Sequence, residues 1–156
     1  MNIKDLAFIE SHYVKMMFYP NAWEKHQTLN LKWTNYDFPP NPSNIPDKPG
    51  VYAFVVEPNL FSLNPANGLF YIGKTNSLYN RVGSYKSELN KALTDTKRPL
   101  VWKMLHQWNG HLKYYFSTTT DEKEAKMIEQ HMINALRPPF NIQYEAETSK
   151  VMRAFQ

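Results

Sequence analysis

Two short runs of apolar and aromatic residues, 51–56 and 69–72, constrain the fold of this chain more than any other feature. Both are rich in β-branched and aromatic residues and are bounded by residues typical of turns, which predicts two strands. The segment between them carries Pro, Asn and Gly, so we expect the strands to pair as antiparallel neighbours. Gly73 ends the second strand and permits a tight turn or the close approach of the backbone to a ligand.

Helical spacing of apolar residues follows these strands. It predicts helices over 77–93 and 100–108, with a third strand over 112–117. A last helix is expected after Thr119, where Glu122 three residues later has the form of a capping box. Its predicted buried face consists of Ala125, Ile128, Met132, Ile133 and Leu136. The order β-β-α-α-β-α predicts an α+β fold: a small three-stranded, mostly antiparallel sheet flanked by helices.

The first third of the chain has a different character. Apolar residues at helical spacing predict an amphipathic helix over 4–18. Five prolines between residues 39 and 49 break regular structure in the stretch 20–49, which predicts a linker or an irregular segment laid across the domain surface. We therefore expect an N-terminal helical and Pro-rich extension over 1–47, a domain over 48–143 and a C-terminal tail over 144–156.

Composition excludes several classes of protein. The 156 residues include no cysteine, so there is neither a disulfide framework nor a thiolate zinc site. No apolar run approaches the ~18–20 residues of a membrane span, and charged residues interrupt the N-terminus where a signal peptide would be apolar. We expect a cytoplasmic protein with no membrane partner.

Positive charge is concentrated in the middle of the chain. Residues 70–116 hold eight Lys and Arg against Glu88 and Asp95, whereas the segments on either side each carry a net charge of −1. Aromatic residues are interleaved with these cations. A polyanion such as nucleic acid would suit this segment, and a solvated basic face is an equally good interpretation of the charge alone.

Glu129 is the most informative acidic residue. At ~100° per residue, it falls inside the apolar arc of the last predicted helix. A carboxylate on a core-facing stripe is unfavourable unless it is paired or binds a cation. Either a metal ion, a buried salt bridge or an edge position that reaches solvent would account for it.

Four further residues carry possible chemistry. Arg81 and Tyr85 are four residues apart and share one side of their helix, where the arginine suits either a phosphate or Glu129. Lys74 lies in the turn before that helix, a position that suits an anion. Tyr52 and Tyr71 lie on neighbouring strands, where tyrosines most often serve only in packing.

Taken in order, these segments resemble the GIY-YIG nuclease superfamily. Gly50-Val51-Tyr52 resembles its first motif and Tyr71-Ile72-Gly73 its second. Arg81 and Tyr85 follow ten and fourteen residues after Tyr71, a spacing closest to that of the N-terminal nuclease domain of UvrC proteins. The segment 124–129 resembles the metal-binding helix of the family, and 137–141 its closing asparagine motif.

The resemblance implies a metal-dependent endonuclease that hydrolyses DNA phosphodiester bonds. It implies one Mg²⁺, replaceable by Mn²⁺, on Glu129, with Arg81 stabilising the transition state. Tyr52 would be the general base, aided by nearby cations including Lys74, and Tyr71 would position the water or phosphate. Tyr85 would hydrogen-bond within the site. Asn141 would orient the metal helix or a neighbouring loop.

DNA is the partner that the resemblance implies, and RNA is not excluded. The residues expected to contact nucleic acid are Lys74, Lys86, Lys91, Lys97, Arg98 and Lys103, the last four outside the catalytic site. Cutting both strands with one metal site would call for a homodimer or for sequential reorientation. The alternatives are a non-catalytic nucleic-acid-binding module on the same scaffold, an RNA-directed nuclease and an α+β interaction protein.

Overall fold

The computed structural model describes residues 20–24, 29–57 and 68–141. The helix expected over 4–18 and the tail over 144–156 lie outside the described residues. Within them, no helix is both long enough and apolar enough to cross a membrane.

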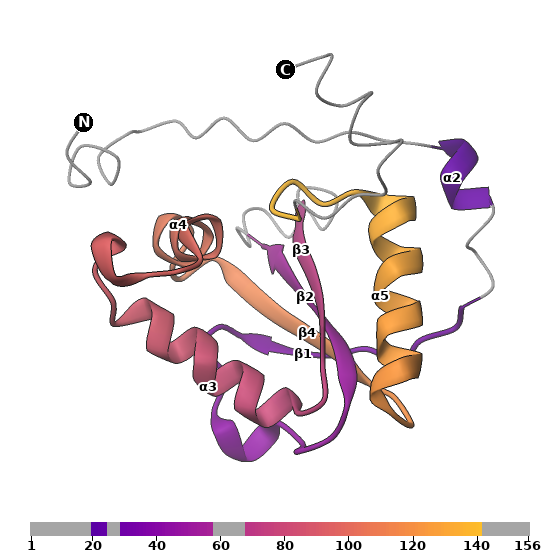
Figure 1. Cartoon of the computed structure of the whole chain (residues 1–156), viewed down its shortest axis with the longest axis horizontal. Helices are drawn as coiled ribbons and strands as arrows, with labels where there is room; N and C mark the ends of the chain where they lie inside the picture. The colour runs from indigo at the N-terminus through magenta and orange to yellow at the C-terminus, as the bar shows by residue number, and fades with distance from the viewer. Residues whose placement is uncertain (1–19, 25–28, 58–67, 142–156) are drawn as a thin grey trace.

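A four-stranded antiparallel sheet forms the middle layer of the molecule, in the order β1-β4-β2-β3. The strands are β1 (Thr34–Asp37), β2 (Gly50–Val56), β3 (Gly68–Thr75) and β4 (Leu112–Thr118). Figure 1 shows α3 (Leu78–Leu89) and α4 (Pro99–Gln107) on one face and α5 (Glu122–Leu136) on the other. The short helix α2 (Pro20–Glu24) contacts α5, and single 3-10 turns cover Pro42–Asn44 and Leu93–Asp95. The predicted α+β class and antiparallel sheet are confirmed.

The prediction of three strands is wrong by one. Residues 20–49 were expected to be irregular, but Thr34–Asp37 pairs with β4 as the edge strand β1. Tyr36 stacks on Phe116, with 6.4 Å between ring centroids. The strand gives no alternating apolar signal because its other side chains are polar and exposed. The prolines between residues 39 and 49 follow β1, so they interrupt none of its hydrogen bonds to β4.

The last helix begins two residues later than predicted. Its N-cap is Asp121, whose carboxylate accepts a hydrogen bond from the backbone N–H of Glu124 at 2.8 Å. Glu122 is instead engaged with Lys74, so it does not complete a capping box with Thr119. At the other end, Leu136 is 38% exposed and Ala135 is buried in its place. Leu136 therefore does not belong to the buried face.

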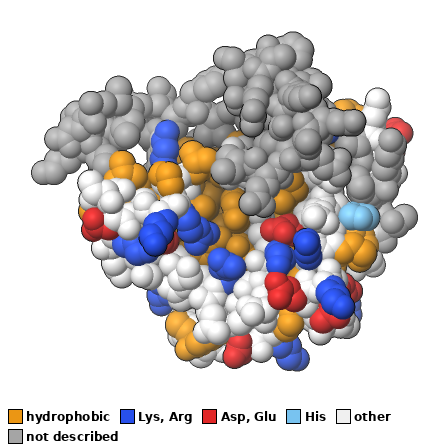
Figure 2. Space-filling model, viewed as in Figure 1, with side chains coloured by type: hydrophobic (Ala, Val, Ile, Leu, Met, Phe, Trp, Pro, Cys, Tyr) orange, Lys and Arg blue, Asp and Glu red, His pale blue; other side chains and the backbone are white. Residues whose placement is uncertain are grey.

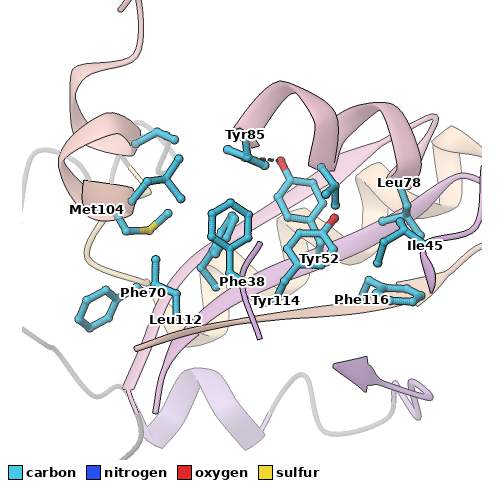
Figure 3. Packing of buried hydrophobic residues seen from close by; sticks show 14 residues of the cluster. Phe38, Ile45, Tyr52, Phe70, Leu78, Tyr85, Met104, Leu112, Tyr114 and Phe116 are labelled. Carbon is cyan, nitrogen blue, oxygen red and sulfur yellow. Dashed lines mark hydrogen bonds between the residues drawn. The ribbon is translucent and has the colours of Figure 1, made fainter. Parts of the chain in front are cut away.

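The larger core lies between the sheet and the α3–α4 layer. Figure 3 shows its aromatic and aliphatic side chains, which include Phe38, Tyr52, Phe70, Tyr85, Met104 and Tyr114. The rings of Tyr52 and Tyr114 stack with 5.6 Å between centroids. Smaller side chains on the opposite face, such as Val51 and Ala53, pack against α5. The sheet therefore presents bulky aromatics to α3 and α4 and small residues to α5.

A β-bulge in β3 departs from strict alternation. Phe54 pairs with Tyr71 and Val55 with Leu69, which leaves Phe70 as an extra residue. As a result, both Phe70 and Tyr71 lie against the aromatic core, while Leu69 packs on the α5 side. The bulge thus brings Phe70 to the same face as Tyr71 and Tyr52.

Gly73 serves a different purpose from the one expected. The strand continues past it to Thr75, so it does not end β3. It lies opposite Tyr52, and a Cβ at this position would overlap the ring and hydroxyl of that tyrosine. The close approach that glycine permits here is that of the Tyr52 side chain.

Replacement of this glycine tests the contact. Gly73→Ala should destabilise the domain by about 2 kcal/mol or more, because the buried Tyr52 ring cannot move away freely. Gly83→Ala is the matched control: its Cβ would meet nothing within 4 Å on an exposed helical position, and it should stabilise by about 0.5–1 kcal/mol. Urea unfolding of both variants measures the difference, and equal stabilities would contradict the packing.

Candidate active site

The candidate site lies at the free edge of β3. Because β3 is the last strand of the sheet, side chains from both of its faces can meet around this edge. After α5 the chain returns to it: the N–H of Phe140 donates to the carbonyl of Phe70 at 3.0 Å. Asn141 accepts from the N–H of Ile72 at 2.9 Å and donates to its carbonyl at 2.7 Å. Asn141 therefore ties the segment after α5 to β3.

A pocket of about 360 Å³ opens beside this edge. Its lining residues come from β3, the start of α4, α5 and the segment after α5: Tyr71, Lys97, Arg98, Pro99, Leu100, Val101, Glu129, Ile133, Phe140 and Asn141. Figure 2 shows apolar side chains in the hollow between the α3–α4 side and α5, with Lys and Arg side chains around it. An anionic ligand with an apolar part would suit such a pocket.

Three of the predicted site residues form a cluster of tyrosines. The hydroxyls of Tyr52 and Tyr85 are hydrogen-bonded at 2.8 Å (Figure 3). The ring centroids of Tyr52 and Tyr71 lie 6.2 Å apart, so the two strands do present them to one side. Tyr52 and Tyr85 are buried, whereas Tyr71 is half-buried and lines the pocket. Of the three, Tyr71 is the one whose hydroxyl makes no hydrogen bond to a described residue.

Burial favours the protonated forms of Tyr52 and Tyr85. It raises the pKa of Tyr52 well above its usual value, and the neighbouring phenols of Tyr85 and Tyr71 raise it further. Burial also raises the pKa of Tyr85. The positive charge of Arg81 opposes both shifts. The domain alone therefore holds two neutral phenols, and a phenolate there would need additional positive charge.

The positive charge of Arg81 acts on both the tyrosines and the carboxylate. It opposes the rise in the pKa values of Tyr52, Tyr85 and Glu129. It is half-buried on α3 and, within the described part of the chain, its guanidinium makes no hydrogen bond or ion pair. Its donors are therefore open to a ligand, and it is not the salt-bridge partner of Glu129.

Glu129 projects from α5 into the pocket and is half-buried. Burial raises the pKa of its carboxyl above the usual 4.5. A hydrogen bond from the backbone N–H of Lys74 and the charges of Lys74 and Arg81 oppose that shift. Its side chain has no ion pair among the residues described, so the buried salt bridge is not the explanation of its position.

This environment fits a magnesium ion. Mg²⁺ is held in many sites by one or two carboxylates together with water and substrate oxygens. Within the described residues, no three His, Asp or Glu side chains form a metal-binding group. Glu129 is a desolvated carboxylate open to the pocket, and it alone would supply the protein's oxygen ligand.

Lys74 makes two contacts with α5. Its ammonium pairs with Glu122 at the surface, and its backbone N–H reaches Glu129. The ion pair lies on the α5 side of the sheet. The lysine therefore connects β3 to α5 at two points.

The basic residues fall into different positions. Lys97 and Lys103 are exposed and Lys86 is half-buried. Lys91 forms an ion pair with the buried Glu88 at 2.6 Å. Arg98, which was expected outside the catalytic site, lies within it: it lines the pocket and its Nη2 donates to the hydroxyl of Tyr85 at 2.9 Å.

Two contacts of the tyrosine cluster were not predicted from the sequence. Arg98 was expected to contact nucleic acid, but not to reach Tyr85: thirteen residues and a loop separate the two, so no helical or strand spacing relates them. Tyr114 stacks on Tyr52, and its buried hydroxyl has no hydrogen-bond partner among the described residues. The alternation of residues 112–117 on a strand beside β2 was a signal that could have found Tyr114.

Tyrosines from two paired strands and the following helix thus form one cluster, and Tyr71 shares its pocket with a glutamate of the last helix. The family model of the UvrC-like GIY-YIG domain matches residues 48–142, and the chain belongs to this family.

Similar proteins agree with this assignment. The UvrABC system protein C of Mycolicibacterium vanbaalenii is 29% identical over 110 residues, covering 70% of this chain and 14% of that protein. The protein of the same name from Mycoplasma capricolum is 32% identical over 98 residues, covering 63% and 14%. The chain thus spans about a seventh of the length of these relatives.

A solved structure with a similar arrangement is the GIY-YIG N-terminal endonuclease domain of UvrC from Thermotoga maritima, bound to its catalytic divalent cation, magnesium. It is 24% identical, with a TM-score of 0.42, and the match covers 63% of this chain and 88% of that one.

The environment of Glu129 predicts opposite responses to pH and to magnesium. Since folding raises its pKa, the wild type should lose stability relative to Glu129→Gln as the pH rises through the folded pKa, by less than about 1 kcal/mol at this half-exposed site. At a pH below 4.5, the pKa of this carboxyl in the unfolded chain, this loss of stability should be absent. Saturating Mg²⁺ should stabilise the wild type at pH 7.5 and leave Glu129→Gln unchanged.

Urea unfolding at acid and neutral pH, with and without Mg²⁺, measures these effects. Glu122→Gln is the control, because Glu122 pairs with Lys74 at the surface and faces no metal. A magnesium response that survives in Glu129→Gln would place the ion elsewhere.

Proposed function

We propose that this chain is a magnesium-dependent endonuclease that hydrolyses phosphodiester bonds in DNA. The observation that carries the proposal is Glu129: a desolvated carboxylate without an ion pair, in a pocket shared with Tyr71 and Arg98 and close to Arg81. Membership of the UvrC-like GIY-YIG family supports the reaction class.

Glu129 would hold the metal, with Mn²⁺ as a substitute for Mg²⁺. When bound, the ion would neutralise phosphate charge and stabilise the leaving oxygen. The remaining ligands would be water and phosphate oxygens. Asn141 contributes by fixing the end of α5 against β3, so that Glu129 keeps its place at the strand edge.

Arg81 would bind the phosphate that is cut. Its planar group of donors is free, half-buried and next to both Glu129 and the tyrosines. Hydrogen bonds to oxygens on which negative charge grows in the transition state accelerate the reaction more than they improve binding. Arg81 should therefore act mainly on the rate of cutting.

Two tyrosines compete for the role of general base. Tyr52 was expected to take it, but its hydroxyl is buried, bonded to Tyr85 and raised in pKa. Tyr71 opens onto the pocket. Tyr52 can act as a base only as a phenolate, so the positive charge of the bound metal ion and of the nearby arginines would have to offset its burial. Tyr71 can orient water or phosphate directly.

Cleavage of supercoiled plasmid tests the function. Wild type should cut with Mg²⁺ and stop in EDTA. Glu129→Ala should lose about 10³-fold or more of the rate and Arg81→Ala about 10²–10³-fold, while both retain DNA binding. Lys123→Ala, an exposed cation on α5, should cut normally.

Full activity of Glu129→Ala in Mg²⁺ would contradict the mechanism. If wild type binds plasmid, single strands and RNA but cuts none of them, the domain is a non-catalytic binding module. Cutting confined to RNA would make it an RNA-directed nuclease.

The pH dependence of cutting separates the two tyrosines. If Tyr52 is the base, Tyr52→Phe should abolish the rise of rate with pH, and Tyr71→Phe should lower the rate at every pH without removing that rise. The reverse pattern would assign the proton to Tyr71. Single-turnover rates between pH 6 and 10 give the profiles.

A further inference from the structure

We propose that Arg98 is a positioning residue, which holds Tyr85 in place and brings positive charge to the hydrogen-bonded pair of Tyr85 and Tyr52. The proposal rests on the nuclease function proposed above and adds to it a residue outside the motifs that carried the family resemblance.

Arg98 contacts Tyr85 in two ways. Nη2 of Arg98 donates to the Tyr85 hydroxyl at 2.9 Å, and the guanidinium carbon lies 4.7 Å from the centroid of the same ring. A cation over an aromatic face is attracted to it, so both the hydroxyl and the ring hold the arginine in place. Arg98 lines the pocket that contains Glu129, and from there it reaches back to the buried tyrosine pair.

Arg98 is linked through Tyr85 to both buried hydroxyls. Arginine has donors and no acceptor, so the Tyr85 oxygen accepts from Arg98. The Tyr85 hydroxyl is also hydrogen-bonded to that of Tyr52 at 2.8 Å, and either of the two can be the donor. The guanidinium therefore lies one hydroxyl away from the Tyr52 oxygen.

This link matters for the chemistry. The positive charge of Arg98 lies over the Tyr85 ring and at its hydroxyl, where it stabilises negative charge on the hydrogen-bonded tyrosine pair. Without Arg98, the pair would lose both this charge and the contact that holds Tyr85 in place. Arg98 therefore prepares Tyr52 to act as a base without touching the substrate.

A buried network holds the backbone of Arg98. Glu88 is 4% exposed, and its carboxylate accepts hydrogen bonds from the Lys91 ammonium and the Thr96 hydroxyl, each at 2.6 Å. Thr96 in turn accepts from the N–H of Arg98 at 2.9 Å. A fully satisfied buried carboxylate of this kind rigidifies the segment around it. The loop between α3 and α4 is thus anchored where Arg98 enters the site.

The neighbouring Lys97 provides a contrast. It is exposed, belongs to the same loop and carries the same charge. It makes no hydrogen bond to the tyrosines. A cation that acts only through phosphate attraction should behave like Lys97, and a positioning residue should not.

Single-turnover cleavage at saturating DNA distinguishes these roles. Arg98→Gln should lower the saturating rate by about tenfold or more near pH 7, and the loss should shrink at higher pH, where ionisation needs less help. Arg98→Lys, which keeps a charged donor, should recover part of the rate. Tyr85→Phe should be slow, and adding Arg98→Gln to it should cause no further loss of rate. Lys97→Gln should raise the DNA concentration needed for saturation and keep the wild-type pH profile.

An Arg98→Gln variant that keeps the saturating rate and pH profile, and only binds DNA more weakly, would overturn the proposal. Failure of the nuclease function is distinguishable, because wild type would then not cut at all. The pair can still be tested by urea unfolding of Arg98→Gln, Tyr85→Phe and the double variant. We expect a coupling of at least about threefold in the unfolding constant, and additive effects would also overturn the assignment.

Discussion

The ring of Tyr52 lies over the Cα of Gly73 on the neighbouring strand, and several elements of the domain meet at this contact. The same ring stacks on Tyr114 of β4 and meets the edge of Tyr85 from α3. One side chain therefore joins three strands to the helix that carries Arg81. Because interiors are close-packed, a shift of Tyr52 would be passed to each of these partners, and the geometry of the site depends on its position.

The edge position of β3 explains how residues on opposite faces of a sheet can form one site. Tyr52 and Tyr71 face α3 and α4, whereas Glu129 comes from the helix on the other face. An inner strand would separate them. At the edge, Tyr71 lines the pocket that also contains Glu129, and Asn141 occupies the backbone groups of Ile72 that would otherwise be unpaired. The same bonds that close the strand edge thus hold α5 and its carboxylate in place.

The residues that could be predicted from sequence are those with a periodic signal. The strands over 51–56, 69–72 and 112–117 were found because β-branched and aromatic residues mark them, and Glu129 was found because a charge interrupts an apolar arc. β1 was missed because an exposed edge strand of polar residues has no period to detect. Arg98 was expected to contact nucleic acid outside the site, and its contact with Tyr85 was missed because the path of a loop sets it, which Thr96 and the buried Glu88 hold through hydrogen bonds.

The electrostatics of the site show why these residues do not simply stabilise the fold. Tyr52, Tyr85 and Glu129 are all desolvated in a way that disfavours their charged forms, and Arg81 lies among them without a partner of its own among the described residues. A core optimised for stability would neutralise Arg81 with Glu129 or replace both with apolar side chains. Keeping them apart leaves a cation and a carboxylate that form no ion pair with any described residue. In the function proposed above, a phosphate and its metal ion would pair with both groups, so the cost of leaving them unpaired in the fold would be offset by binding.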